Sequence, residues 1–291
     1  MKKVIVITGP TSSGKTDLSI ELAKFFKAEI INADSVQIYK KFDIGSSKIT
    51  LEEKQNIKHH LISKINPEAC YNVYNFQKDT RKLISKIKVP FLVGGSGLYI
   101  KAALFDYEFV KEKKNIKSNN LNLSQMLKII EQKDSNLILD KSNPHRVIRA
   151  YQQTFQKKLR SQKNGKNKPL FDILFLYLDI PRDILKKRIV ARLEKMIQKG
   201  FIQEVEYLVK NHPQANFNII GYKEIKDFLD KKKDLIETKK IIITKSIQYA
   251  KRQKTWFKNQ IPSLKLINPL ETNAKEVAKK IIKNFLKEGN K

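Results

Sequence analysis

Short apolar runs alternate with amphipathic stretches along most of the chain. An apolar run bounded by turn residues predicts a buried strand, and apolar residues about three or four positions apart predict a helix. Strands are predicted at residues 3–8, 29–33, 90–93, 171–178 and 264–267. Helices are predicted at residues 15–27, 73–87, 96–104, 182–199, 201–210, 222–229, 235–259 and 273–287. Because strands alternate with helices, we expect an α/β fold, a parallel sheet with helices on both faces.

Two polar stretches interrupt this alternation. Residues 106–141 are rich in lysine and asparagine and have weak periodicity, and residues 161–169 read SQKNGKNKP, which is typical of a linker. We therefore expect a small, mainly helical insert at 106–141. The core would then consist of residues 1–105 and 142–291.

A phosphate-binding loop follows the first predicted strand. The pattern G-x-x-x-x-G-K-[ST] stands between a strand and a helix, as a P-loop requires. Its residues are Gly9, Pro10, Thr11, Ser12, Ser13, Gly14, Lys15 and Thr16. Backbone N–H groups and the helix N-terminus would hold an anion there, with Lys15 on the terminal phosphate oxygens and the Thr16 hydroxyl on Mg²⁺. The loop predicts a P-loop NTPase-like sheet, but it fits ATP, GTP and other diphosphate esters alike.

The charge of the chain bears on its partner. Lysine and arginine number 59 against 29 aspartates and glutamates, a formal net charge of +30. That excess favours nucleic acid, although a lysine-rich composition throughout would give the same number without any RNA. No apolar run approaches the ~20 residues of a membrane-spanning helix. With one cysteine and therefore no internal disulfide, we expect a cytoplasmic protein.

Two aspartates end predicted strands, where ligands of α/β proteins bind. Asp34 is placed to take a proton from a nucleophile or to hold Mg²⁺ through water, and a turn residue is the alternative. Asp179 has the position of a Walker-B carboxylate. The Ile-Pro that follows it favours a turn or helix start over a Mg²⁺ ligand.

Several segments occur in the order seen in bacterial tRNA dimethylallyltransferases. They are GPTSSGKT, INADSVQIYKKFDIGSSK, HHLI, PFLVGGSGLYIKAAL, NPHRVIRA, RLEKMIQKGFIQEV, IIGYKEI and YAKRQKTWFK. The chain resembles this family over nearly its whole length, except 106–141 and the C-terminal helix. The resemblance implies transfer of a dimethylallyl group from dimethylallyl diphosphate to N6 of adenosine 37, beside the anticodon of tRNAs that read U-starting codons, with release of diphosphate.

The resemblance also implies residue roles. Asp34 would be the general base, Thr11 and Arg192 the other catalytic residues, and the loop with Mg²⁺ would hold the diphosphate. The implied tRNA contacts are Asp34, Ser35, Val36, Gln37, Ser96, His145, Arg146, Arg149, Gly221, Tyr222, Lys223, Lys251, Arg252 and Gln253. A plain loop, packing or solvated-face role remains the alternative for Thr11, Ser96 and Arg192. We expect a monomer that binds the tRNA anticodon stem-loop, and no membrane contact.

The chain departs from the family pattern in places. Asn218 and Lys223 stand where arginine is usual, His145 replaces a frequent glutamine, and the insert is shorter than the usual arm. Three other functions stay open: a small-molecule P-loop kinase, prenylation of free adenine nucleotides, and RNA binding without catalysis. The positive charge counts against the first two functions, and the loop together with Asp34 counts against the third.

Overall fold

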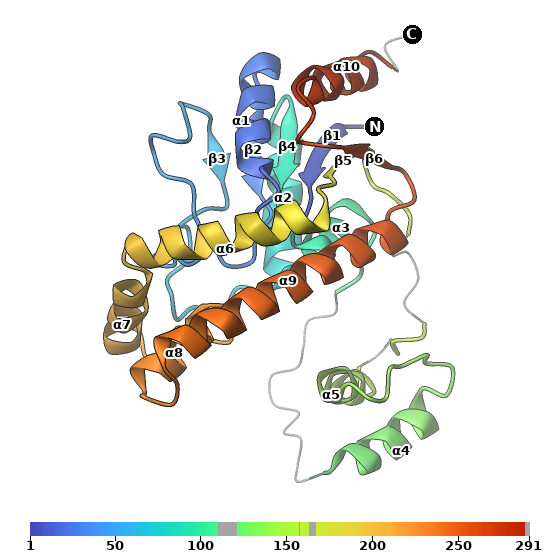
Figure 1. Ribbon diagram of the computed structural model, residues 1–291. Helices are drawn as coiled ribbons and strands as arrows, with labels where there is room; N and C mark the ends of the chain where they lie inside the picture. The colour runs from blue at the N-terminus through green and yellow to red at the C-terminus, as the bar shows by residue number, and fades with distance from the viewer. Residues whose placement is uncertain (110–120, 157, 163–166, 289–291) are drawn as a thin grey trace. The chain divides into compact units, whose positions relative to one another are not determined.

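The computed structural model describes residues 1–109, 121–156, 158–162 and 167–288 (Figure 1). The chain divides into two compact units, Met1–Leu104 with Pro169–Lys291, and Phe105–Lys168. The second unit extends further along the chain than the predicted insert 106–141, so residues 142–168 lie outside the core. Parts of the predicted insert and of the predicted linker, 110–120 and 163–166, lie outside the described residues.

The first unit is built on a parallel sheet. Its strands are β1 Lys3–Thr8, β2 Glu29–Asn32, β3 His59–His60, β4 Pro90–Val93, β5 Asp172–Leu178 and β6 Leu264–Ile267. Their order is β3-β2-β4-β1-β5-β6, and every neighbouring pair is parallel. In β1, Ile5 pairs with Phe91 on one side and Leu174 on the other. The predicted parallel sheet is confirmed, and only the two-residue strand β3 was not predicted, because two residues carry no pattern.

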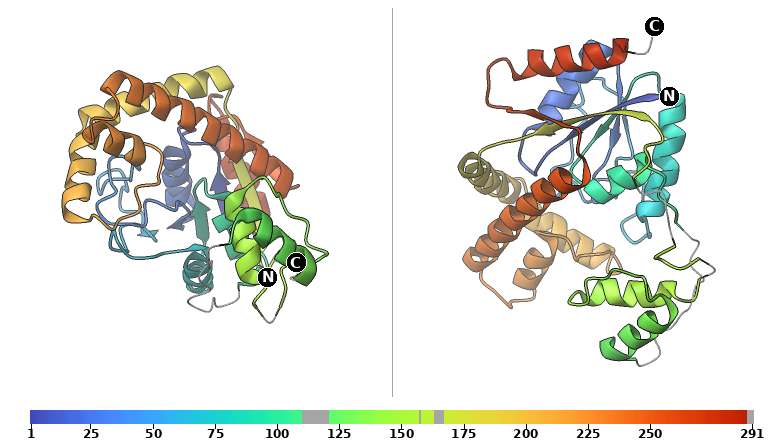
Figure 2. Two further views of the ribbon diagram at one scale, coloured as in Figure 1. Left: turned by 90° about the horizontal axis from the view of Figure 1, so that it is seen from below. Right: turned by 90° about the vertical axis from the view of Figure 1, so that its right-hand side faces the viewer.

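Helices cover both faces of this sheet. α1 (Lys15–Phe26) and α10 (Ala274–Lys287) share one apolar cluster with the strands, to which they contribute Leu22 and Ile282. α2 (Val73–Lys86) and α3 (Gly97–Leu104) lie on the opposite side from α1 (Figure 2). The predicted arrangement of helices on both faces is thus confirmed.

Four further helices form a second core in the first unit. They are α6 Arg182–Gln198, α7 Phe201–Asn211, α8 Tyr222–Leu229 and α9 Leu235–Gln260. Leu193, Phe201 and Tyr222 pack together with Ile242 inside this group. α6 and α9 run past the ends of the central strands (Figure 1), and they carry their side chains to the site described below.

The second unit has its own small core. α4 (Leu123–Lys133) and α5 (Pro144–Gln153) pack through an apolar cluster that includes Met126 and Val147. The side chain of Asn143 caps α5 by accepting a hydrogen bond from Arg146 N. This packing is the reason the unit reaches beyond residue 141: α5 must bury its apolar face against α4.

Phe257 tests how α9 is fixed to the sheet. Its ring is fully buried, and its centroid lies 5.7 Å from that of Tyr177 on β5. We expect Phe257→Ala to lower the free energy of unfolding by about 3–5 kcal/mol, because transfer and cavity terms add. Leu266→Ala, at a β6 position 62% exposed, should change it by less than ~0.5 kcal/mol. Urea unfolding measures the free energy of unfolding of both variants. Equal losses would contradict the conclusion that Phe257 fixes α9 to the sheet.

Candidate active site at the carboxyl ends of the strands

The carboxyl ends of the central strands bring four chain segments together. The P-loop follows β1, Asp34 follows β2, Gly94-Gly95 follows β4 and Asp179 follows β5. A hollow of about 320 Å³ opens there. Its lining includes Thr11, Ser12, Asp34, Ser35, Val36, Arg192, Asn218, Gly221 and Tyr249. The edge of the sheet where α/β proteins bind ligands therefore carries most of the predicted catalytic groups.

The P-loop packs closely against its surroundings. Gly14 caps α1 with a positive φ of 89°, a conformation that glycine adopts without strain. A Cβ at Gly9 would stand 2.9 Å from the backbone oxygen of Leu178, so that position has no room for a side chain. The loop and the helix after it have the local geometry that the sequence predicted.

Lys15 turns its ammonium group into this loop. Its Nζ donates to the backbone oxygens of Gly9, at 3.1 Å, and Pro10, at 2.6 Å. Burial, reinforced by the nearby Arg192 and opposed by Asp34, lowers the pKa of Lys15 to about 7. An anion bound beside Lys15 would favour its charged form.

Arg192 joins α6 to the loop. Its Nη1 donates to Thr11 Oγ1 at 2.6 Å, and its Nε donates to Ser47 Oγ at 2.8 Å. Burial lowers the pKa of the Arg192 guanidinium, while Asp34 raises it. The structure thus brings together the three predicted catalytic residues Thr11, Asp34 and Arg192. Ser47, which the sequence analysis missed, belongs to the same constellation.

Asp34 uses one carboxylate oxygen to shape its own turn. Oδ1 accepts hydrogen bonds from Val36 N at 2.8 Å and from Gln37 N at 3.3 Å. Asp34 also lines the hollow, and its charge acts on Lys15 and Arg192. The turn role and a role facing the hollow are therefore compatible.

Tyr249 on α9 is a lining residue that the sequence analysis missed. It lines the hollow, and burial together with Asp34 raises its pKa to about 12. Tyr249 stands one helical turn before Gln253, so it shares that residue's face of α9. That spacing was the one feature of the sequence that pointed to it.

Glu204 on α7 fixes the segment that Arg192 contacts. Its carboxylate accepts hydrogen bonds from the backbone N–H groups of Asp43 (2.9 Å), Ile44 (2.6 Å) and Gly45 (3.0 Å). The hydroxyl of Tyr222 donates to the same carboxylate at 2.7 Å. Ser46 and Ser47, which follow, are the residues that receive Arg192. No short-range pattern marks Glu204, because its three backbone partners lie about 160 positions away.

Several predicted tRNA contacts have other surroundings in the structure. Tyr222 is fully buried and bound to Glu204, so its side chain has a packing role. Gln253 is also buried, whereas its neighbours Lys251 and Arg252 are exposed on α9. Lys223 is exposed as well. His145, Arg146 and Arg149 are exposed positions of α5 in the second unit.

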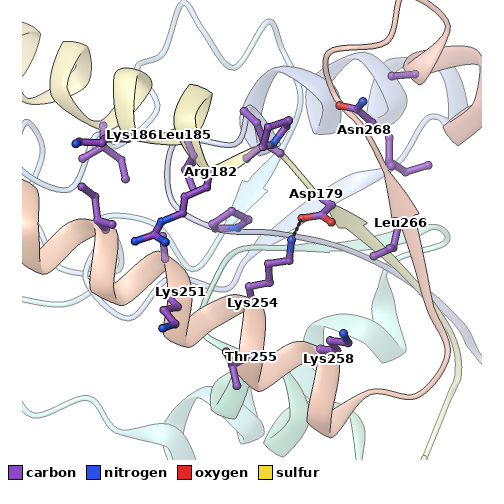
Figure 3. A pocket seen from close by; sticks show the side chains of 18 of the residues that line it. Asp179, Arg182, Leu185, Lys186, Lys251, Lys254, Thr255, Lys258, Leu266 and Asn268 are labelled. Carbon is purple, nitrogen blue, oxygen red and sulfur yellow. Dashed lines mark hydrogen bonds and ion pairs between the residues drawn. The ribbon is translucent and has the colours of Figure 1, made fainter.

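Asp179 is paired with a lysine. Its Oδ1 lies 2.6 Å from Lys254 Nζ (Figure 3). The pair stands in a cavity of about 980 Å³ between α6, α9 and β6, which Arg182 and Lys186 also line. This pairing favours the interpretation of Asp179 as a strand-end residue rather than a Mg²⁺ ligand.

Thr16 is exposed at the start of α1, beside a hollow lined by Asp17, Glu21 and Glu53. Among the described residues, no group of three or more His, Cys, Asp or Glu side chains is arranged to hold a metal ion. Protein-bound Mg²⁺ typically has one or two protein ligands and takes the rest from water and substrate phosphates. Thr16 therefore fits a Mg²⁺ ion that a bound diphosphate helps to hold.

The sheet order, the anion loop after the central strand and the cations turned toward it define an α/β protein of the P-loop type. A model of the family described as IPP transferase matches residues 37–260. The tRNA dimethylallyltransferase of Aster yellows witches'-broom phytoplasma (strain AYWB) is 52% identical over 290 residues, 99% of each chain. The chain therefore belongs to the IPP transferase family. It is a prenyltransferase that acts on tRNA.

Solved structures agree with this assignment. The tRNA delta(2)-isopentenylpyrophosphate transferase of Staphylococcus epidermidis is 34% identical with a TM-score of 0.72, covering 97% of this chain and 100% of that one. A eukaryotic dimethylallyltransferase acting on tRNA is 28% identical with a TM-score of 0.84, covering 98% of this chain and 80% of that one. Within the described residues, no helix is long and apolar enough to cross a membrane.

The lowered pKa of Lys15 predicts a pH-dependent difference in stability. With a pKa of about 7 in the folded chain and an ordinary value of 10.5 in the unfolded chain, this group binds more protons in the unfolded chain between these limits. It therefore makes stability rise with pH in that window. Lys15→Met should remove this contribution. Urea unfolding across the window would show the wild-type free energy of unfolding climbing relative to the variant, and parallel profiles would contradict the prediction.

Proposed function

We propose that the enzyme transfers a dimethylallyl group from dimethylallyl diphosphate to N6 of adenosine 37 in tRNAs that read U-starting codons, and releases diphosphate. The observation that carries this proposal is the convergence of Asp34, Arg192 and the P-loop on one hollow. A base and an anion site in the same hollow suit a reaction that removes a proton from one substrate and a diphosphate from the other.

Asp34 is the proposed general base. The exocyclic amine of adenine is a weak nucleophile, because its lone pair is delocalised into the ring, and it must lose a proton as its nitrogen bonds to the allylic carbon. A carboxylate in the hollow takes that proton. The bonds from Val36 N and Gln37 N to Oδ1 hold the carboxylate in place.

The leaving diphosphate is the proposed ligand of the P-loop. As the carbon–oxygen bond breaks, negative charge grows on the diphosphate, and prearranged donors stabilise it. Lys15, the helix N-terminus of α1 and Arg192 supply those donors. Mg²⁺, held by Thr16 and the ligand's phosphates, would neutralise further charge.

The loop therefore serves the allyl donor in this proposal, although its pattern also fits ATP. A kinase would need a carboxylate such as Asp179 for its metal, and Lys254 pairs with that carboxylate at 2.6 Å. The names of the relatives, which are tRNA-modifying enzymes, count against free adenine nucleotides as acceptors. We propose a cytoplasmic monomer as the working form.

Exposed basic residues are the proposed contacts with the anticodon stem-loop, argued for each unit separately. Lys251 and Arg252 are exposed on α9 in the first unit, and Arg146 and Arg149 on α5 in the second. Arginine and lysine in such positions neutralise phosphates and release counterions, which makes binding depend on salt. Ser35 and Val36 line the hollow, which the target base would enter in this proposal, and Ser96 stands in the turn after β4.

The product of the reaction tests the proposal. The protein is incubated with Mg²⁺, dimethylallyl diphosphate and a tRNA containing A36-A37. Mass spectrometry of the digested tRNA should then find N6-dimethylallyladenosine. Asp34→Asn keeps an oxygen for Val36 N but loses the base, so turnover should fall by about 10²–10⁴-fold. Binding of inorganic diphosphate should persist in the variant.

Two results would overturn the proposal. One is consumption of ATP by the protein with no reaction of the allyl donor. The other is undiminished turnover by Asp34→Asn.

Arg146 tests the tRNA contact of the second unit. Its side chain is 60% exposed, and its Nη1 lies 3.6 Å from Asp140 Oδ2. Arg146→Ala should weaken tRNA binding by about 1–2 kcal/mol and reduce the salt slope by about one. Fluorescence anisotropy at several salt concentrations measures both, and an unchanged slope would rule out the contact. Lys141→Ala, which removes an exposed lysine paired with Glu131, is the matched control for loss of charge alone.

A further inference from the structure

Gln253 makes two hydrogen bonds that together span the site. Its Oε1 accepts from Thr11 N at 3.1 Å, and its Nε2 donates to the backbone oxygen of Gly95 at 2.9 Å. One planar amide on α9 therefore touches the P-loop after β1 and the turn after β4. The residue is only 7% exposed; its bond to Gly95 is buried and its bond to Thr11 is partly buried.

We propose that Gln253 is a positioning residue for the diphosphate loop. The family motif had instead implied that Gln253 contacts tRNA. The inference rests on the proposed function, because it assigns the P-loop to the allyl diphosphate. It corrects the expectation for Gln253 alone. The neighbouring Lys251 and Arg252 keep their proposed contact with RNA.

Thr11 is the point at which this positioning acts. Gln253 holds its backbone N–H from α9, and Arg192 donates to its hydroxyl from α6 at 2.6 Å. The loop residue is thus fixed on its main chain and its side chain by two different helices. Since Oε1 occupies the N–H of Thr11, the diphosphate must be held by amides further along the loop.

Gly95 packs so closely against the amide of Gln253 that there is no room for a side chain. A Cβ at this position would overlap Nε2 of Gln253. The φ of Gly95 lies outside the left-handed region, so the backbone itself would accept alanine. The amide of Gln253 is therefore the main obstacle to a side chain there, which makes Gly95→Ala a way to displace it without changing α9.

α9 carries residues of both kinds close together. Tyr249 lines the hollow and Gln253 reaches the loop, whereas Arg252, one position before Gln253, is exposed. Losing either bond leaves a buried group without a partner, which is costly in a site of this kind.

The test separates binding of the two substrates. Titration calorimetry with inorganic diphosphate and Mg²⁺ measures the loop, and fluorescence anisotropy measures tRNA. Gln253→Leu, which loses both bonds, should weaken diphosphate binding by about tenfold. Gln253→Glu keeps the acceptor for Thr11 N but loses the donor to Gly95 and adds a negative charge beside the anion loop, so it should weaken diphosphate binding at least as much. The dissociation constant and salt slope for tRNA without donor should stay within about twofold.

Gly95→Ala should reproduce the loss of diphosphate affinity seen in Gln253→Leu. Gln248→Leu, at an exposed glutamine of the same helix, should leave both constants unchanged. Arg252→Gln should show the reverse pattern, with weaker tRNA binding and a smaller salt slope. Thermal unfolding of every variant identifies any that has lost its fold. If Gln253→Leu does not fold, the diphosphate affinities of Gln253→Glu and Gly95→Ala test the inference instead.

Weaker tRNA binding with unchanged diphosphate binding in the Gln253 variants would overturn the inference. So would unchanged binding of both ligands. The diphosphate titration needs no turnover, so it reports on Gln253 even if the wild-type protein makes no prenylated adenosine. Failure of the proposed function is therefore distinguishable from failure of this inference.

Discussion

Two cations beside one carboxylate are the constraint on which the site depends. Lys15 and Arg192 are both desolvated, and in each case Asp34 is the neighbouring charge that favours the ionised form. Partly buried cations with a single compensating carboxylate leave positive charge that an anion would stabilise. This electrostatic imbalance gives the P-loop a physical reason to bind an anion, beyond the match of its sequence pattern.

Long-range hydrogen bonds hold this charge arrangement in place. Arg192 reaches Thr11 and Ser47, and the segment carrying Ser47 is fixed by Glu204, which collects three consecutive backbone N–H groups. Gln253 supports the same loop from α9. Most of the groups proposed to do the chemistry thus come from short segments near the N-terminus, while Arg192 and the supporting residues come from helices in the C-terminal half. A residue far from the hollow can matter to it through such supports.

The fold was largely predictable because its elements have local causes. Strands β1, β4 and β5 are nearly continuous apolar runs, as strands of a parallel sheet buried on both faces should be. The P-loop was predictable because its backbone geometry demands glycine at fixed spacing. The boundary of the second unit was misplaced because the packing of α4 on α5 is tertiary. The weak periodicity of residues 106–141 suggested that the insert ends at residue 141. The apolar cluster that contains Met126 and Val147 extends the unit beyond that residue.

By itself the sequence determined the parallel α/β sheet, the anion loop and the carboxylate after the second strand, since each depends on residues close together in the chain. Only the tertiary structure decided what each motif residue touches. It turned Tyr222 toward Glu204, Asp179 toward Lys254, and Gln253 toward Thr11. The physical reason is that a side chain's partner is set by the packing of helices distant in sequence, and a motif fixes the residue without fixing the direction in which it points.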